Sequence, residues 1–85
     1  MNVKLNREEF EYLYQGNFMT HELLEKITKA FLIENDFYLL EISDEDADTI
    51  RDICGEQLQK VGFDGDYNPT REGNILERLI DKFYG

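Results

Sequence analysis

One long amphipathic helix constrains the fold of this chain more than any other feature of its sequence. Between Ser43 and Gly62, small or apolar residues recur three and four positions apart, which is the spacing of one helix face. They are Ala47, Ile50, Ile53, Cys54, Leu58 and Val61. Ser43 is a typical N-cap, and Gly62 is a typical residue just after a helix. The rest of the 85-residue chain must cover the apolar face of this predicted helix over 44–61. A chain of this length has the size of one domain, so we expect a single domain, 1–85.

Three further helices are predicted from capping residues followed by apolar residues at helical spacing. They cover 7–15, 21–30 and 71–84, and their expected N-caps are Asn6, Thr20 and Thr70. Glu9 follows Asn6 by three residues, which is the capping-box pattern. The positions expected to face the core are Phe10, Leu13, Leu23, Leu24, Ile27, Ile75, Leu76, Leu79, Ile80 and Phe83, with Tyr14 as an additional candidate on the first helix.

Two or three short strands complete the predicted fold. Val3 and Leu5 alternate with polar neighbours, and 37–42 is rich in aromatic and aliphatic residues. The apolar segment 31–33 is either a strand that forms a hairpin with 37–42 or the end of the preceding helix. We therefore predict the α+β class: about four helices in a single layer on a small antiparallel sheet of two or three strands. The last two helices should pack against each other and against the sheet.

Net charge limits the partners that this chain can bind. Nineteen Asp and Glu residues stand against nine Lys and Arg residues, for a formal net charge of −10. Such a surface repels phosphate backbones and anionic membranes, so we expect no direct nucleic-acid binding and no membrane docking. The first ten residues are polar and acidic, unlike a signal peptide, and no apolar run approaches the roughly 20 residues of a membrane span. We expect a cytoplasmic protein with basic protein partners.

Catalytic chemistry has few candidates in this sequence. His21 and Cys54 are the only residues of their types. Cys54 falls on the apolar face of the predicted long helix, where a cysteine usually packs as a small apolar side chain. A zinc site needs three or four histidine and cysteine ligands, and the scattered glycines form no phosphate-binding loop. We expect no enzyme and no cofactor.

A row of acidic residues occupies another face of the predicted long helix. Four acids spaced four positions apart share one ridge, and two more lie near its start. In order, the six are Glu41, Asp44, Glu45, Asp48, Asp52 and Glu56. Like charges at this spacing cost roughly 0.2–0.5 kcal/mol per pair, and the helix dipole offsets that cost only near the first turn. Our hypothesis is that the row binds a basic partner surface; the alternative is a solvated face on an acidic protein.

The segment after the long helix resembles the start of an EF-hand calcium loop. Asp64, Asp66 and Asn68 have the D-x-D-x-N spacing. The pattern then fails, because Pro69 stands where a glycine makes the turn and Ile75 stands where a bidentate glutamate belongs. Calcium binding is therefore a weak alternative to a loop built from Asx turns.

The sequence leaves three hypotheses for function. The first is a small acidic protein-interaction module of the antitoxin, immunity or inhibitor kind, or an acidic mimic of nucleic acid, that binds a basic protein surface. Phe63 and Tyr67 flank the acidic loop and either join this interface or pack the loop against the helices. The second is a homo-oligomeric accessory or structural protein, in which a homodimer forms through aromatic residues. The third is a weak calcium-binding domain.

Overall fold

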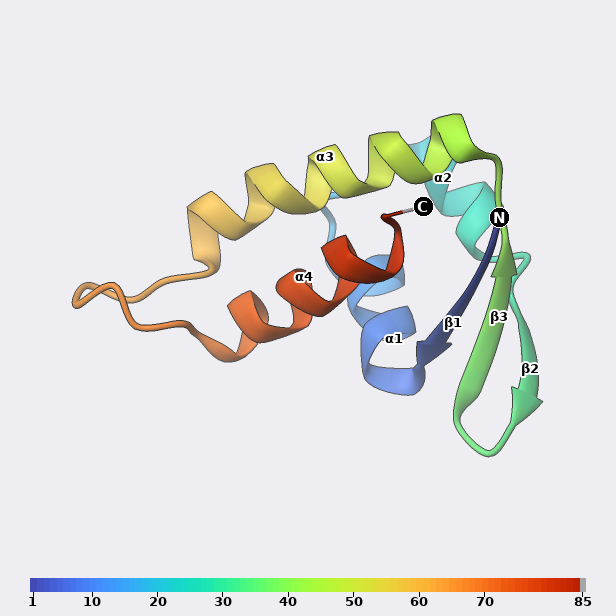
Figure 1. Ribbon diagram of the computed structural model, residues 1–85, viewed down its shortest axis with the longest axis horizontal. Helices are drawn as coiled ribbons and strands as arrows, with labels where there is room; N and C mark the ends of the chain where they lie inside the picture. Colours follow the sequence, from blue (N-terminus) through green and yellow to red (C-terminus); the bar gives the residue numbers. More distant parts are fainter. Residues whose placement is uncertain (85) are drawn as a thin grey trace.

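The structure is a computed structural model that describes residues 1–84. Its elements in chain order are β1 (Asn2–Asn6), α1 (Arg7–Gln15), α2 (His21–Ile27), β2 (Phe31–Glu34), β3 (Phe37–Glu41), α3 (Asp44–Val61) and α4 (Arg71–Lys82). The strands form one antiparallel sheet in the order β1-β3-β2. Figure 1 shows the sheet at one end of the molecule, with the long α3 above α4. The described residues therefore confirm the predicted α+β fold.

The four helices begin where the capping residues predict. Asn6, Thr20, Ser43 and Thr70 each accept a hydrogen bond from the backbone N–H three residues further on, over 2.8, 3.3, 3.1 and 3.0 Å respectively. The capping box also closes, because the Glu9 carboxylate accepts a 2.9 Å hydrogen bond from the backbone N–H of Asn6. Local chemistry thus determines the start of every helix in residues 1–84.

The predicted extent of α2 was too long. This helix ends at Ile27 and not at Ala30. The hydroxyl of Thr28 donates a 2.7 Å hydrogen bond to the Glu25 carbonyl, and the backbone N–H groups of Lys29 and Ala30 donate to carbonyls only three residues earlier. These tighter bonds turn the chain out of the helix. The chain then enters β2, so the ambiguous segment 31–33 is a strand.

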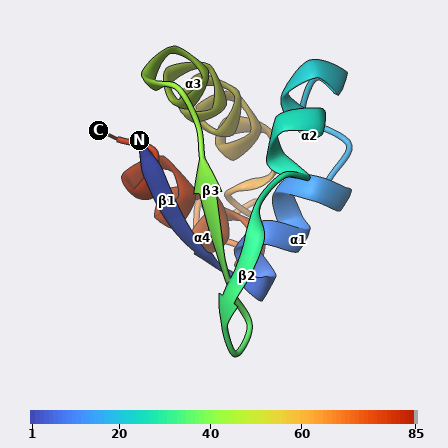
Figure 2. The same cartoon turned by 90° about the vertical axis from the view of Figure 1, so that its right-hand side faces the viewer.

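Strand pairing places one face of the sheet against the helices. Val3 lies opposite Leu40, and Leu5 lies opposite Tyr38. Val3, Leu5 and Leu40 are buried, and the ring of Phe10 in α1 stacks on Tyr38 with 4.3 Å between ring centroids. In Figure 2 the strands lie in front of α1 and α4, and no helix of the described residues crosses in front of them. The helices thus form a single layer on one face, as predicted.

The predicted core positions fall into two groups. The buried group combines the strand residues above with residues of the helices and with Phe83, which follows α4. The helical members are Leu13, Leu23, Ile27, Ala47, Ile50, Cys54, Ile75, Leu76 and Leu79. The remaining predicted positions pack on this core but stay partly exposed: Phe10, Leu24, Ile53, Leu58, Val61 and Ile80. The additional candidate Tyr14 is not a core residue, because it is 47% exposed. Within residues 1–84, no helix combines the length and the apolar composition needed to cross a membrane.

The facing ends of α3 and α4 are joined through backbone contacts. The carbonyl of Gly62, just after α3, accepts a 2.8 Å hydrogen bond from the Thr70 N–H. The Thr70 hydroxyl donates a 2.7 Å hydrogen bond to the Val61 carbonyl. Gly73, in the first turn of α4, packs directly on the Gly62 backbone. From there α4 runs along α3 and ends at Lys82, shorter than the predicted 71–84.

Candidate functional site

The six acids of the predicted row form one exposed stripe. Glu41 ends β3, and the others lie on the outer side of α3, away from the buried Ala47, Ile50 and Cys54. We call this set the acidic stripe: Glu41, Asp44, Glu45, Asp48, Asp52 and Glu56. Because α3 rises 1.5 Å per residue, the part of the stripe on this helix, from Asp44 to Glu56, extends over about 18 Å. Its shape suits a long contact with another macromolecule better than a small molecule.

Most carboxylates of the acidic stripe have no basic partner within the described part of the chain. The N-terminal amino group approaches Asp44 to 3.8 Å, and Arg51 approaches Asp48 to 3.0 Å. The Asp44 side chain is 91% exposed and that of Asp48 is 63% exposed, so water screens both pairs strongly. The stripe therefore keeps nearly all of its negative charge.

Basic side chains of this chain pair mainly with acids outside the stripe. Lys26 of α2 lies 2.6 Å from Asp46, the one acid in the first turn of α3 that does not belong to the stripe. Its hydrogen bond holds the pKa of the Asp46 carboxyl below the usual range. Three more bases, all on α4, contact α1. Charge pairing is thus concentrated between the helices, whereas four of the six stripe acids have no basic partner in the described residues.

Glu9 is a buried carboxylate whose ion pairs the sequence did not reveal. It accepts hydrogen bonds from Lys82 Nζ at 2.5 Å and Arg78 Nε at 3.2 Å. Burial acts most strongly and raises the pKa of Glu9, but the hydrogen bonds from Lys82 and from the capping box outweigh it, so the pKa lies below its usual value. Next to it, Glu8 binds Arg71 at 2.8 Å and Arg78 at 2.7 Å, which lowers the pKa of Glu8.

The predicted aromatic candidates lie in the loop beyond the far end of α3. Figure 1 shows this loop projecting at the end of the molecule opposite the sheet. Phe63 forms an isolated antiparallel bridge with Pro69 and is 44% exposed. Tyr67 is in the left-handed region with φ of 63° and is 87% exposed. The whole length of α3 separates this aromatic pair from Glu41, so the predicted residues form an extended surface and not one pocket.

The acidic residues of this loop hold the turn together. The Asp64 Oδ1 atom accepts hydrogen bonds from the backbone N–H groups of Asp66 at 2.9 Å and Asn68 at 3.0 Å. The Asp64 N–H in turn donates a 2.9 Å bond to the Asn68 carbonyl. Within residues 1–84, no group of three or more His, Cys, Asp or Glu side chains is placed to hold a metal ion. The geometry gives the calcium alternative no support.

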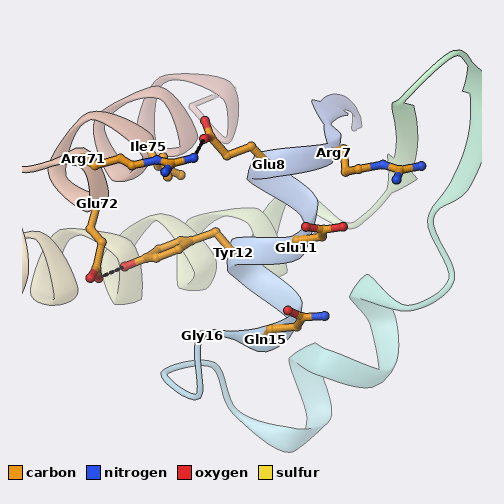
Figure 3. Close-up of a pocket in the computed structure, with 9 residues that line it drawn as sticks. All are labelled: Arg7, Glu8, Glu11, Tyr12, Gln15, Gly16, Arg71, Glu72 and Ile75. Carbon is orange, nitrogen blue, oxygen red and sulfur yellow. Dashed lines mark hydrogen bonds and ion pairs between the residues drawn. The ribbon is translucent and has the colours of Figure 1, made fainter.

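A shallow groove of about 730 Å³ lies between α1 and the start of α4. Figure 3 shows its lining, which consists of Arg7, Glu8, Glu11, Tyr12, Gln15, Gly16, Arg71, Glu72 and Ile75. The Tyr12 hydroxyl donates a 2.8 Å hydrogen bond to Glu72. Burial and this neighbouring carboxylate raise the pKa of Tyr12 to about 12. The phenol thus stays protonated at neutral pH. The lining contains no serine, cysteine or histidine, and its carboxylates are those of Glu8, Glu11 and Glu72.

The two single-copy residues considered for catalysis lie in different surroundings. Cys54 is fully buried in the core, and burial raises the pKa of its thiol to about 12. The thiol is therefore unreactive at neutral pH, as its predicted packing role implies. The side chain of His21 is 88% exposed at the start of α2, where its Nε2 atom lies 3.2 Å from Glu25.

Removal of the two unpaired acids beyond the first turn of α3, Asp52 and Glu56, should stabilise the fold. Asp52 and Glu56 lie beyond the first turn, where the helix dipole no longer offsets their repulsion from Asp48 and from each other. We expect the double variant Asp52→Asn/Glu56→Gln to raise the free energy of unfolding by about 0.5 kcal/mol in urea denaturation at low salt. The control Glu11→Gln/Glu77→Gln, at exposed positions on other helices, should change the free energy of unfolding little. A loss of stability in the first variant would mean that these acids support the fold.

The comparisons with known proteins identify no relative, since no family model, no curated protein and no solved structure matches this chain.

Proposed function

We propose that this chain is a small acidic protein-interaction module that binds a basic protein surface through the acidic stripe. Under this proposal it acts by binding and not by catalysis. The partner is a protein with a positively charged groove or ridge long enough to follow α3. A cleft that normally holds nucleic acid is one such surface, because a row of carboxylates presents the same sign of charge as a phosphate backbone.

The observation that carries the proposal is the segregation of charge. Bases and acids pair between α1 and α4 and between α2 and α3, whereas four of the six stripe acids have no basic partner in residues 1–84. Repulsion along α3 opposes folding, so the pattern does not serve stability. A basic partner would relieve this repulsion on binding, and complementary charge would accelerate association and select the partner.

The loop at the end of α3 supplies the apolar part of the proposed interface. Tyr67 is exposed on a left-handed turn, and Phe63 is held in the same loop by the bridge to Pro69. Aromatic side chains are favoured at protein interfaces, because they bury a large area at a small cost in conformational entropy. Tyr67 and Phe63 would thus anchor one end of a contact whose remaining length is electrostatic.

We expect a stripe variant to lose the partner in a pull-down from the source lysate with stepped salt elution and mass spectrometry. The variant carries Asp44→Asn, Asp48→Asn, Asp52→Asn and Glu56→Gln, and it folds if its circular dichroism melt remains cooperative. The wild-type chain should retain a basic protein that elutes at moderate salt, because screening weakens charge pairing. For that partner, the variant should bind at least about 100-fold more weakly, which is roughly 2.7 kcal/mol.

A second variant with the same net charge controls for non-specific electrostatic effects. It carries Glu11→Gln, Glu25→Gln, Glu77→Gln and Asp81→Asn, all at exposed positions outside α3. Both variants remove four negative charges from the formal −10. Retention of the partner by this control and its loss from the stripe variant would support the proposal. Equal retention by both, or equal loss from both, would show that the stripe is not the binding surface.

A further inference from the structure

Strand β2 leaves three consecutive apolar side chains exposed. Phe31 is 51% exposed, Leu32 is 57% exposed and Ile33 is 40% exposed. No residue of β2 is buried, whereas β1 alternates exposed residues with the buried Val3 and Leu5. The strand thus gains a hydrogen-bonded neighbour in β3 but little apolar burial, although Phe, Leu and Ile are residues that normally lie inside.

The free face of the sheet continues this apolar surface. Lys4 lies opposite Leu39, and Leu39 lies opposite Phe31, so these three side chains form one row across β1, β3 and β2. This row is on the side away from the buried Val3 and Leu5, because neighbouring residues of a strand point to opposite faces. Lys4 Nζ also lies 4.5 Å from the centre of the Phe37 ring.

The outer edge of β2 is open to another strand. In the order β1-β3-β2 this strand has a neighbour on one side only, so alternate backbone N–H and C=O groups of its outer edge lack sheet partners. The side chains of Phe31, Leu32 and Ile33 carry no charge that would keep another strand away. In Figure 2 the β2–β3 hairpin extends away from α3, so this edge is remote from most of the acidic stripe.

The distribution of charge over the surface favours this edge for contact with a second copy of the chain. Two molecules that each carry −10 repel each other over most of their surfaces. Within residues 1–84, three lysines have no carboxylate partner, namely Lys4, Lys29 and Lys60. Two of them flank the exposed apolar surface: Lys4 lies on the free face, and Lys29 lies just before β2. The sheet end therefore lacks the excess of unpaired acid that α3 carries.

We propose that β2 pairs antiparallel with β2 of a second copy, forming a twofold homodimer with one continuous six-stranded sheet. The order of charges along the chain fits this pairing, because Lys29 precedes the strand and Glu34 ends it. In an antiparallel pair centred near Leu32, Lys29 of each copy comes within ion-pair reach of Glu34 of the other. A parallel pair would instead bring like charges together.

The available area indicates a reversible dimer and not an obligate one. A large side chain carries on the order of 200 Å² of accessible surface, so the exposed parts of Phe31, Leu32 and Ile33 amount to roughly 300 Å² per copy. A standard interface buries about 800 Å² per partner. Phe37, Leu39 and the aligned backbone edges add to the contact. This inference is independent of the proposed function, because it uses none of the stripe residues.

Sedimentation velocity between about 5 and about 500 μM protein tests the proposal. We expect a monomer–dimer equilibrium that strengthens as NaCl rises from about 50 to about 500 mM, because salt screens the repulsion between two acidic copies. Binding of a basic partner should weaken over the same range. Phe31→Lys/Leu32→Lys should weaken the dimer at least about tenfold. Both positions are more than half exposed, so the monomer should keep its melting temperature.

Charge exchange tests the direction of the strands. Lys29→Glu and Glu34→Lys should each weaken the dimer, and the double variant should restore it, since only the antiparallel pair places the two residues together. Tyr67→Lys, at the opposite end of α3, is a control that should leave dimerisation unchanged. A monomer at every concentration and salt would overturn the proposal. So would association that Phe31→Lys/Leu32→Lys leaves intact, a double variant that restores nothing, or growth beyond a dimer.

Discussion

Replacement of Glu9 by glutamine should lower the free energy of unfolding by about 2–3 kcal/mol, as expected when one member of a buried, hydrogen-bonded ion pair is lost. Glutamine keeps the shape of the side chain and can still accept the bond from the capping-box N–H. It loses the charge that Lys82 and Arg78 contact at 2.5 and 3.2 Å. Urea denaturation near neutral pH measures the difference.

The control for this variant is Glu11→Gln, on the same helix but exposed. It should alter the free energy of unfolding by less than about 0.5 kcal/mol. If Glu9→Gln is as stable as the wild type, the buried cluster does not hold α4 against α1. A stabilising Glu9→Gln would mean that desolvation of the carboxylate exceeds its attraction to the two bases, as happens at some buried ion pairs.

The same residue predicts how stability changes with pH. The pKa of Glu9 is lower in the folded chain than its usual value, so the unfolded chain takes up a proton more readily than the folded chain does. Its contribution to stability is therefore complete above the unfolded pKa of about 4.3 and is lost as pH falls through the lower folded pKa. Glu9→Gln should reduce the dependence of stability on pH across this acidic range. An unchanged pH dependence would contradict the lowered pKa.

Substitution of Gly73 by alanine should lower the free energy of unfolding by about 2 kcal/mol, as overpacking typically does. A β-carbon at Gly73 would overlap the carbonyl oxygen of Gly62 and approach its C and Cα atoms to 3.0 Å. Those atoms are backbone, and the hydrogen bond from Thr70 holds that carbonyl in place. The gain in helix propensity, about 1 kcal/mol for alanine over glycine, is smaller than the expected strain.

Gly55 provides a matched comparison within α3. A β-carbon at Gly55 has no neighbouring atom within 4 Å, so Gly55→Ala should raise the free energy of unfolding by about 0.5–1 kcal/mol through helix propensity alone. Thermal melts of the two single variants should shift in opposite directions. A stabilising Gly73→Ala would show that the ends of α3 and α4 separate readily, against the close backbone contact described here.

Features that depend on a few neighbouring residues could be predicted from the sequence. The N-caps at Asn6, Thr20, Ser43 and Thr70 act over three residues, so their chemistry is visible in short stretches of sequence. The acidic stripe was predicted for the same reason, because a spacing of four residues determines which side chains share a helix face.

Features that depend on distant residues could not be predicted. Segment 31–33 was ambiguous because its strand conformation depends on pairing with β3. The partners of Glu9 lie 69 and 73 residues further along the chain, too far away for a local pattern to reveal. The contact of Gly73 with Gly62 depends on how two helices meet. The lack of basic partners along the stripe likewise could not be predicted, because the sequence does not show that Lys26 binds Asp46 and not an acid of the stripe.

The long separation between Glu9 and its two bases bears on how the chain is made. A ribosome releases the first helix long before it releases the last one, and contacts of such high sequence separation form late because a long loop must close first. Until α4 emerges, Glu9 has no counter-ion to accompany it into the core, and burial without one is costly. We therefore expect the nascent chain to remain open until α4 has emerged and can dock on α1. A chaperone that shields exposed apolar segments would act within that interval.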